Sequence, residues 1–165
     1  MHRKAVLIDP HAQSITDIVI ELPDDRHASE RVLNDVLHQL IDCEMLEATY
    51  FDLPGHPTSL VLSDEEGLMV DEPAYFTLYN HPIPGRGVLV CEDGMGNVCD
   101  ATFTAADIQR IVNFVSARFA QAARDLAHQQ QIQDLRDKGF VVQPFEDGAG
   151  YMVISPPQAG EPPTS

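Results

Sequence analysis

The stretch GRGVLVCEDGMGNVCDATFTAADI, residues 85–108, carries residue types that can hold a phosphate or a metal ion. A dinucleotide-binding loop places its glycines between a strand and the first turn of a helix. Here Gly85 and Gly87 precede the predicted strand, and Gly96 lies eight residues before Thr104, where the next helix is expected to begin. No Lys-Ser or Lys-Thr pair follows, which excludes a P-loop. We therefore expect a hairpin turn at EDGMGN, whose glycines supply positive φ angles.

The cysteines in the same stretch do not have the spacing of a zinc site. Seven residues separate Cys91 from Cys99, and the sequence contains no CxxC pair. Structural zinc sites are built from tighter pairs, so Cys43 and scattered histidines would have to complete the ligand set. The segment DGMGNVCD also lacks the alternating oxygen ligands and closing Glu of a calcium loop. We expect no metal and no cofactor, with the cysteines as reduced, free thiols.

Catalytic motifs are missing as well. There is no GxSxG, and the histidines do not occur in HxH, HExxH or HxxxH spacing. Carboxylate pairs are frequent, but in so acidic a chain they arise without a catalytic purpose. The sequence therefore predicts no catalytic residues and a protein that is not an enzyme, with an unrecognised active site as the alternative.

The densest functional candidate is the segment LSDEEGLMVDEP. It carries five carboxylates within nine residues: Asp64, Glu65, Glu66, Asp71 and Glu72. One interpretation is a solvated hairpin turn. The other is an acidic edge that docks a basic surface, with Arg86 in a following loop as a possible ion-pair partner of this edge. Both interpretations stay open at the level of sequence.

Charge and hydropathy restrict the partners further. The 165 residues include 26 acidic and 10 basic side chains, for a net charge of −16. Such a surface repels nucleic-acid phosphates and attracts basic proteins. No window approaches the ~18 apolar residues of a membrane span, and the N-terminal apolar run AVLI is too short for a secretory signal. An odd number of cysteines suits a reducing compartment, so we expect a cytoplasmic protein that binds neither membrane nor nucleic acid.

These candidate residues lie on elements that the hydrophobic pattern predicts. The strands are expected at residues 4–8 and 14–22, which form a hairpin, then at 44–53, within 58–73 and at 87–93. Residues 74–80 are ambiguous, and residues 81–87 read as a loop. One helix has an apolar face with a period of 3.6 residues and starts near Asp24 or Ser29; its face consists of Val32, Leu33, Val36, Leu37, Leu40 and Ile41.

A second, long helix is expected over residues 104–138. Thr104 and Asp107 resemble a capping box, and Gly139 is a typical helix stop. Its predicted buried face comprises Ile108, Ile111, Val112, Val115 and Phe119. Beyond this face we expect Leu126, Ile132 and Leu135 to contact either a second copy, in a homodimer through residues 120–138, or the hairpin predicted at residues 140–154.

The order of elements predicts an α+β fold with a mostly antiparallel sheet covered by an amphipathic helix, plus the long second helix and the C-terminal hairpin. We expect a single domain over residues 1–155, with a core at 4–115 and an extension at 104–155. The tail, residues 156–165, is rich in Pro and is predicted to be disordered.

Four phrases carry a resemblance to a known family: AVLIDPHAQSITDIVIE, LIDCEMLEA, LVLSDEEGLMVDEPAYFTL and GRGVLVCED. Over residues 4–115 the chain resembles a family of small uncharacterised proteins, catalogued as a domain of unknown function and frequent in phages, plasmids and actinobacterial mobile elements. The resemblance implies an accessory protein of a mobile element and no known chemistry.

Taken together, these features predict a small acidic accessory protein that acts by protein binding, on a partner such as a host defence or DNA-processing protein. A deep pocket lined by Arg or Lys would instead favour a protein that sequesters a nucleotide-like ligand.

The net charge gives the first testable prediction. We expect no measurable binding to duplex DNA at physiological salt, because the charge of −16 opposes every phosphate contact. A gel mobility assay with short duplexes measures this directly. A shift at micromolar protein under those conditions would contradict the prediction.

Overall fold

The computed structural model describes residues 1–69, 73–144 and 151–154. It divides into two compact units, residues 1–121 and residues 122–165. The first contains all the predicted site residues that the structure describes, and the α+β fold with its antiparallel sheet is confirmed. The single domain expected over residues 1–155 stays a prediction.

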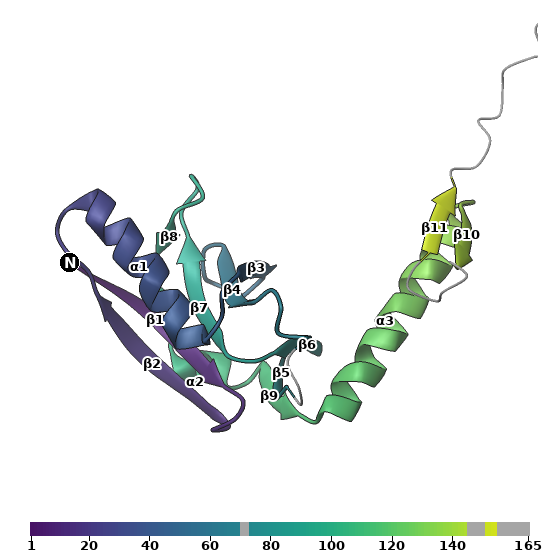
Figure 1. The fold of residues 1–165 in the computed structure, drawn as a ribbon, viewed down its shortest axis with the longest axis horizontal. Helices are drawn as coiled ribbons and strands as arrows, with labels where there is room; N and C mark the ends of the chain where they lie inside the picture. The colour runs from purple at the N-terminus through teal and green to yellow at the C-terminus, as the bar shows by residue number, and fades with distance from the viewer. Residues whose placement is uncertain (70–72, 145–150, 155–165) are drawn as a thin grey trace, which may run out of the picture. The chain divides into compact units, whose positions relative to one another are not determined.

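The first unit is built on a six-stranded sheet in which all neighbours are antiparallel. The strand order is β2-β1-β7-β4-β3, with β8 also paired to β7 (Figure 1). Its members are β1 (His2–Asp9), β2 (Ser14–Glu21), β3 (Leu46–Phe51), β4 (Ser59–Asp64), β7 (Gly87–Glu92) and β8 (Val98–Cys99). The predicted hairpin of the first two strands is confirmed.

Helix α1 (Arg26–Ile41) covers one face of this sheet (Figure 1). Its N-cap is Asp25, not Asp24 or Ser29 as predicted, because the Asp25 carboxylate accepts the amide of Ala28 at 2.8 Å. The predicted apolar face of the helix packs on the alternate residues of the sheet that point to this side, such as Leu60, Val88 and Val90. The expected amphipathic helix is therefore confirmed.

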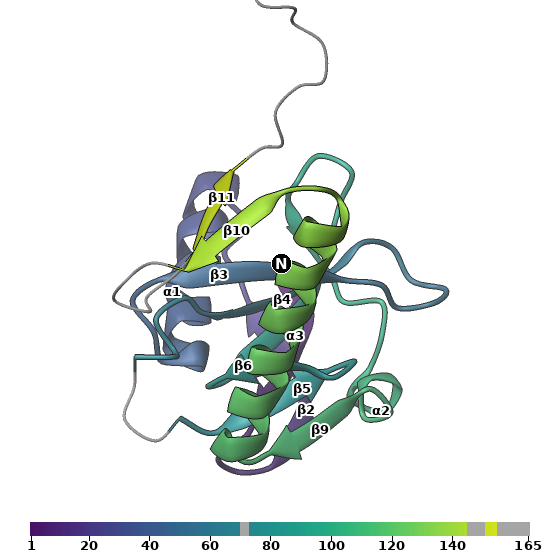
Figure 2. The same cartoon turned by 90° about the vertical axis from the view of Figure 1, so that its right-hand side faces the viewer.

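A second, three-stranded sheet packs on the opposite face of the first. It consists of β5 (Tyr75–Leu78) between β6 (His81–Pro84) and β9 (Val112–Val115), as Figure 2 shows. The ambiguous segment 74–80 thus supplies a strand, and the loop predicted at residues 81–87 was wrong, because β6 lies there. Pro82 and Pro84 are compatible with a strand since β6 is an edge.

The predicted long second helix is confirmed, but its predicted start was wrong: it covers Ala117–Asp137 and not residues 104–138. The chain forms a short helix α2 (Ala105–Ile108), then strand β9, then helix α3 (Ala117–Asp137). The predicted capping box begins α2 instead, with the Asp107 carboxylate accepting the Thr104 amide at 2.8 Å. The run from Val112 to Val115 is rich in β-branched and aromatic residues, and it pairs with β5 instead of continuing the helix.

This correction changes the environment of the predicted helix face. Ile108 and Val112 are buried in the core of the first unit, but from two different elements. Phe119 lies on α3 with 51% of its surface exposed, so it is not part of a buried helical face.

The second unit contains most of α3 and a hairpin. Helix α3 ends as predicted at Gly139, whose φ is +86°, with the Phe140 amide bonded to the Leu135 carbonyl at 3.0 Å. Strands β10 (Val141–Pro144) and β11 (Tyr151–Ile154) form the predicted antiparallel hairpin. Ile132 and Leu135 are half-buried, but Leu126 is 64% exposed. The tail predicted at residues 156–165 lies outside the described residues.

At Gly87, a side chain of the second sheet packs directly on the backbone of the first. A Cβ built on it would lie 2.6 Å from Cζ of Phe76 and 3.0 Å from Cγ2 of Val61. Phe76 is fully buried, so its ring has no room to move away. Only glycine fits at this point of β7.

We therefore expect Gly87→Ala to lower the free energy of unfolding by about 1–3 kcal/mol, the usual effect of overpacking a core. Gly94→Ala is the matched control, because no atom lies within 4 Å of its added Cβ. Urea unfolding of both variants and the parent measures the effect. Equal stability of the two variants would contradict this account of the packing.

Candidate functional site

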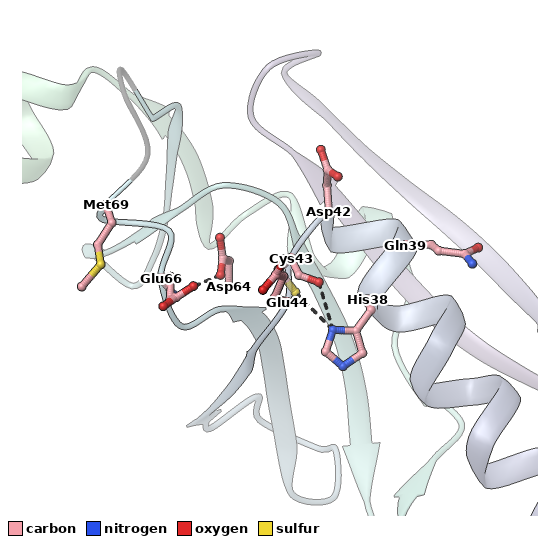
Figure 3. Close-up of a pocket in the computed structure, with 8 residues that line it drawn as sticks. All are labelled: His38, Gln39, Asp42, Cys43, Glu44, Asp64, Glu66 and Met69. Carbon is pink, nitrogen blue, oxygen red and sulfur yellow. Dashed lines mark hydrogen bonds between the residues drawn. The ribbon is translucent and has the colours of Figure 1, made fainter.

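The candidate site is an acidic cavity of about 520 Å³ where α1 ends, β3 begins and β4 turns (Figure 3). Its lining comes from three segments that meet at this end of the sheet. The lining residues are His38, Gln39, Asp42, Cys43, Glu44, Asp64, Glu66 and Met69. Four of the eight are carboxylates, which gives the cavity a concentrated negative charge.

The local backbone explains why the carboxylates gather here. Helix α1 stops at Asp42, which adopts a left-handed conformation with φ of 64° and bonds its amide to the His38 carbonyl at 2.9 Å. The chain then enters β3, whose Leu46 lies opposite Asp64 in the ladder. Glu44 therefore lies across from the turn that follows β4.

That turn is held by its own carboxylate. Oδ1 of Asp64 accepts the amide of Glu66 at 3.0 Å, and the Asp64 carbonyl accepts the amide of Gly67 at 3.2 Å. The Glu65 amide donates to the Met45 carbonyl at 3.1 Å, which ties the turn to the start of β3. The acidic segment thus begins with a turn, with Asp64 and Glu66 lining the cavity (Figure 3). The turn is not that of a hairpin, because the next strand, β5, pairs with β6 and β9 in the second sheet and not with β4.

Only some of the predicted site residues line the acidic cavity. Asp64 and Glu66 line the cavity, while Glu65 is exposed on the same turn and does not line it. Asp71 and Glu72 lie outside the described residues. Asp42 and Glu44 belong to the cavity but were not predicted. A signal existed for them, because the antiparallel pairing of the two predicted strands would place the start of one beside the end of the other.

Arg86 pairs with none of the described carboxylates of the acidic segment, which are Asp64, Glu65 and Glu66. Its Nε donates to Oδ2 of Asp9 at 2.9 Å, so this guanidinium is bound to the β1–β2 turn. Arg86 and Asp64 both line an adjoining cavity of about 140 Å³, so the two lie in one neighbourhood without forming an ion pair. Asp9 is distant in sequence from Arg86, so proximity along the chain did not indicate this ion pair.

The Asp9 carboxylate is the group that binds Arg86 beside the acidic cavity. Burial of its carboxyl opposes ionisation and by itself raises the pKa. The hydrogen bond from the Ala12 amide, the hydrogen bond and charge of Arg86, and the His11 amide outweigh that effect and hold the pKa of Asp9 below its ordinary value. The ionised form therefore stabilises the turn and fixes Arg86.

Cys43 and His38 are the groups in the cavity that could do chemistry. Nδ1 of His38 lies 3.0 Å from the Cys43 carbonyl and 3.8 Å from its Sγ. A carbonyl only accepts, so Nδ1 carries the proton and cannot take one from the thiol. Burial, together with the charges of Asp64 and Asp42, raises the pKa of the Cys43 thiol. The thiol is thus protonated at neutral pH, which is unfavourable for a nucleophile.

A second cavity, of about 740 Å³, lies near the first turn of α1 and the β7–β8 turn. Arg3 and Arg26 line it together with apolar residues that include Leu22, Leu33 and Leu37. Nε of Arg3 is buried and has no hydrogen-bond partner within the part of the chain that the structure describes. Three carboxylates share the lining and offset the two guanidinium charges: Asp24, Glu30 and Asp93.

The glycine-rich segment EDGMGN forms the turn of the β7–β8 hairpin, as predicted, although Gly94 does not have the predicted positive φ. Gly96 has φ of +85°, and the Asp93 carboxylate accepts the amides of Met95 and Asn97, each at 2.9 Å. Cys91 and Cys99 face each other in the ladder as free thiols. Among residues 1–69, 73–144 and 151–154, no three His, Cys, Asp or Glu side chains are grouped closely enough to hold a metal ion.

Comparison with protein-family models, with curated proteins and with solved structures finds no match to this chain. In the described part of the protein, no helix has the length and apolar character needed to cross a membrane.

The Asp9–Arg86 pair generates a pH prediction. Because the pKa of Asp9 is lowered by folding, its stabilisation is complete above the unfolded value of about 3.9 and is lost as the pH falls through the lower folded value. Asp9→Asn should therefore lower the free energy of unfolding at neutral pH by about 1 kcal/mol, and the gap to the parent should close in acid.

Urea unfolding of the parent and Asp9→Asn between about pH 7 and about pH 2 measures that gap. Asp35→Asn, on the exposed side of α1, changes the net charge equally and serves as the control. A gap for Asp9→Asn that stays constant through the acid range would show that the Asp9 charge contributes nothing to stability.

Proposed function

We propose that this protein is a small acidic accessory protein that acts by binding a basic segment of another protein at the acidic cavity. The observation that carries the proposal is the convergence of Asp42, Glu44, Asp64 and Glu66 on one open cavity, while the nearby cation Arg86 is bound to Asp9. No ion pair to these four carboxylates occurs among the described residues. Their charges are therefore available to a partner.

Electrostatics favours a partner with clustered positive charge. Unpaired surface carboxylates repel one another, and a Lys or Arg from outside relieves that repulsion. The overall charge of −16 also speeds the approach of basic proteins, most strongly at low salt, where the Debye length is longest. The same charge disfavours nucleic acid, so a DNA-processing or defence protein would offer its basic surface to this chain in place of DNA.

The biological setting of the proposal rests on the sequence resemblance over residues 4–115. A protein of a phage, plasmid or other mobile element that binds a host protein in the cytoplasm fits an acidic surface and free thiols. The binding role requires no catalytic group, in keeping with the raised pKa of Cys43.

A second candidate function is the binding of a small ligand in the cavity beside Arg3. The observation that favours it is the buried Arg3 Nε without a partner among the described residues, next to an apolar lining. An increase in melting temperature with a nucleoside triphosphate, abolished in Arg3→Gln, would favour this candidate over protein binding. The three carboxylates of that cavity weigh against a phosphate-bearing ligand.

Protein capture with three baits tests the first proposal. The baits are the parent, a cavity variant (Glu44→Gln, Asp64→Asn, Glu66→Gln) and an equally neutralised control (Glu21→Gln, Asp35→Asn, Asp134→Asn). Three exposed charge pairs at about 0.5 kcal/mol each make roughly 1.5 kcal/mol, so the cavity variant should bind its partner about tenfold more weakly.

The expected result is a set of basic proteins retained by the parent and the control but lost by the cavity variant, identified by mass spectrometry from the native host. Retention of the same set by both variants would show that the cavity does not bind the partner.

A further inference from the structure

The outer edge of β3 is a regular strand edge without the features that usually protect such an edge. Strand β6 contains Pro82 and Pro84, and β9 is only four residues long. Strand β2 lies against α2, and its Asp17 carboxylate holds the Ala105 amide at 2.8 Å. By contrast, β3 has the sequence LEATYF over six residues, with no proline, no lysine and no bulge in its ladder.

The ladder shows which backbone groups point outward from β3. The Glu65 amide donates to the Met45 carbonyl, so Leu46 and Asp64 form a non-hydrogen-bonded pair. By the alternation of an antiparallel ladder, the N–H and C=O groups of Leu46, Ala48 and Tyr50 then face away from β4. In the described part of the chain, no hydrogen bond reaches these groups.

The two ends of this edge have different chemistry. At the first end lies the acidic cavity with Glu44, Asp64 and Glu66. At the second end lies an apolar cavity of about 610 Å³, between the end of β3 and the β5–β6 turn. Its lining consists of Thr49, Tyr50, Phe51, Asp52, Leu78, Tyr79, His81 and Ile83.

One aromatic side chain of the apolar cavity, Tyr79, is exposed and held in place. Tyr79 is 50% exposed, whereas the Tyr50 hydroxyl is hydrogen-bonded to Glu92 and its side chain shares the α1 face of the sheet with Leu60. Tyr79 forms the β5–β6 turn with Asn80, with φ angles of 46° and 71°, and its hydroxyl donates to the Asp52 carbonyl at 3.0 Å. A tyrosine is unusual at a left-handed turn position, where Asn and Gly are favoured. Its hydroxyl links this turn to the chain just after β3.

We propose that the partner of the acidic cavity binds as an added β-strand along the outer edge of β3. The segment places a Lys or Arg in the acidic cavity and an aromatic or aliphatic residue in the apolar cavity. This inference rests on the proposed function and specifies its ligand: an extended segment, basic at one end and apolar at the other. Main-chain bonds to Leu46, Ala48 and Tyr50 supply affinity, and the two cavities supply specificity.

The spacing of the two cavities fixes the length of the segment. Strand β3 spans six residues, or about 20 Å at about 3.3 Å per residue. An antiparallel segment runs from the apolar residue toward the basic one, and a parallel segment runs in the opposite order. About six residues must therefore separate the two anchors in either direction.

Synthetic peptides test strand addition against charge attraction alone. The probe is Phe-Thr-Val-Thr-Val-Thr-Lys-Lys, together with its reversed sequence. Matched peptides carry N-methyl groups on alternate residues, in both registers, or Glu in place of Lys. Binding is followed by the amide resonances of isotopically labelled full-length protein.

We expect one direction of the unmodified peptide to bind and to shift the amides of Ala48 and Tyr50, with one N-methylated register binding about tenfold more weakly or worse. Equal binding of both N-methylated peptides would overturn strand addition and leave the acidic cavity as a charge-based site. Equal binding of the Glu peptide would overturn the proposed function itself. No binding of any peptide at about 1 mM would overturn this inference.

Ala48→Pro supplies the complementary test on the protein. Proline removes the outward N–H of Ala48 without removing a bond to β4, as is tolerated on an edge strand. Ala48→Val keeps that N–H and is the matched control. The proline variant should lose peptide binding while its melting temperature and the resonances of β7 stay near those of the control. Retained binding in a folded Ala48→Pro protein would contradict the proposal.

Discussion

The close packing of Phe76 against Gly87 is the contact on which the rest of the first unit depends. The absence of a side chain at this point of β7 lets the ring of Phe76 lie directly on the central sheet. The second sheet can then cover one face while α1 covers the other. Strand β7 is then buried on both faces except at its last residue, Glu92, as its run of apolar residues requires.

Covering both faces leaves the ends and edges of the sheet as the places where a partner can be bound. At one end, the left-handed stop of α1 and the tight turn after β4 bring carboxylates from separate segments together. The bond between Arg86 and Asp9 removes the neighbouring cation from that cluster. The acidic cavity and the open edge of β3 thus follow from the same architecture. The cavity lies where β3 begins, and the open edge runs along the same strand.

The sequence contained the information for elements whose signal is local. The 3.6-residue period of Val32, Leu33 and their neighbours predicted α1, and Gly139 predicted the end of α3. Strand β9 was missed because residues 112–115 become a strand only through pairing with β5, more than thirty residues earlier. The pairing of Arg86 with Asp9 was missed for the same reason. Asp64 and Glu66 were predicted as part of a charged turn. Their cavity with Asp42 could not be predicted, because the sequence does not show where the end of α1 lies relative to that turn.

The central claim is that the outer edge of β3 is open in the free protein and available to a partner strand. Amide hydrogen exchange of the full-length protein tests it most directly, because alternate residues of β3 should differ. We expect the amides of Ala48 and Tyr50 to exchange at rates near those of an unstructured chain, while those of Glu47 and Thr49, bonded to β4, exchange slowly. Slow exchange of Ala48 and Tyr50 in the free protein would show that the edge is already occupied and would contradict the account.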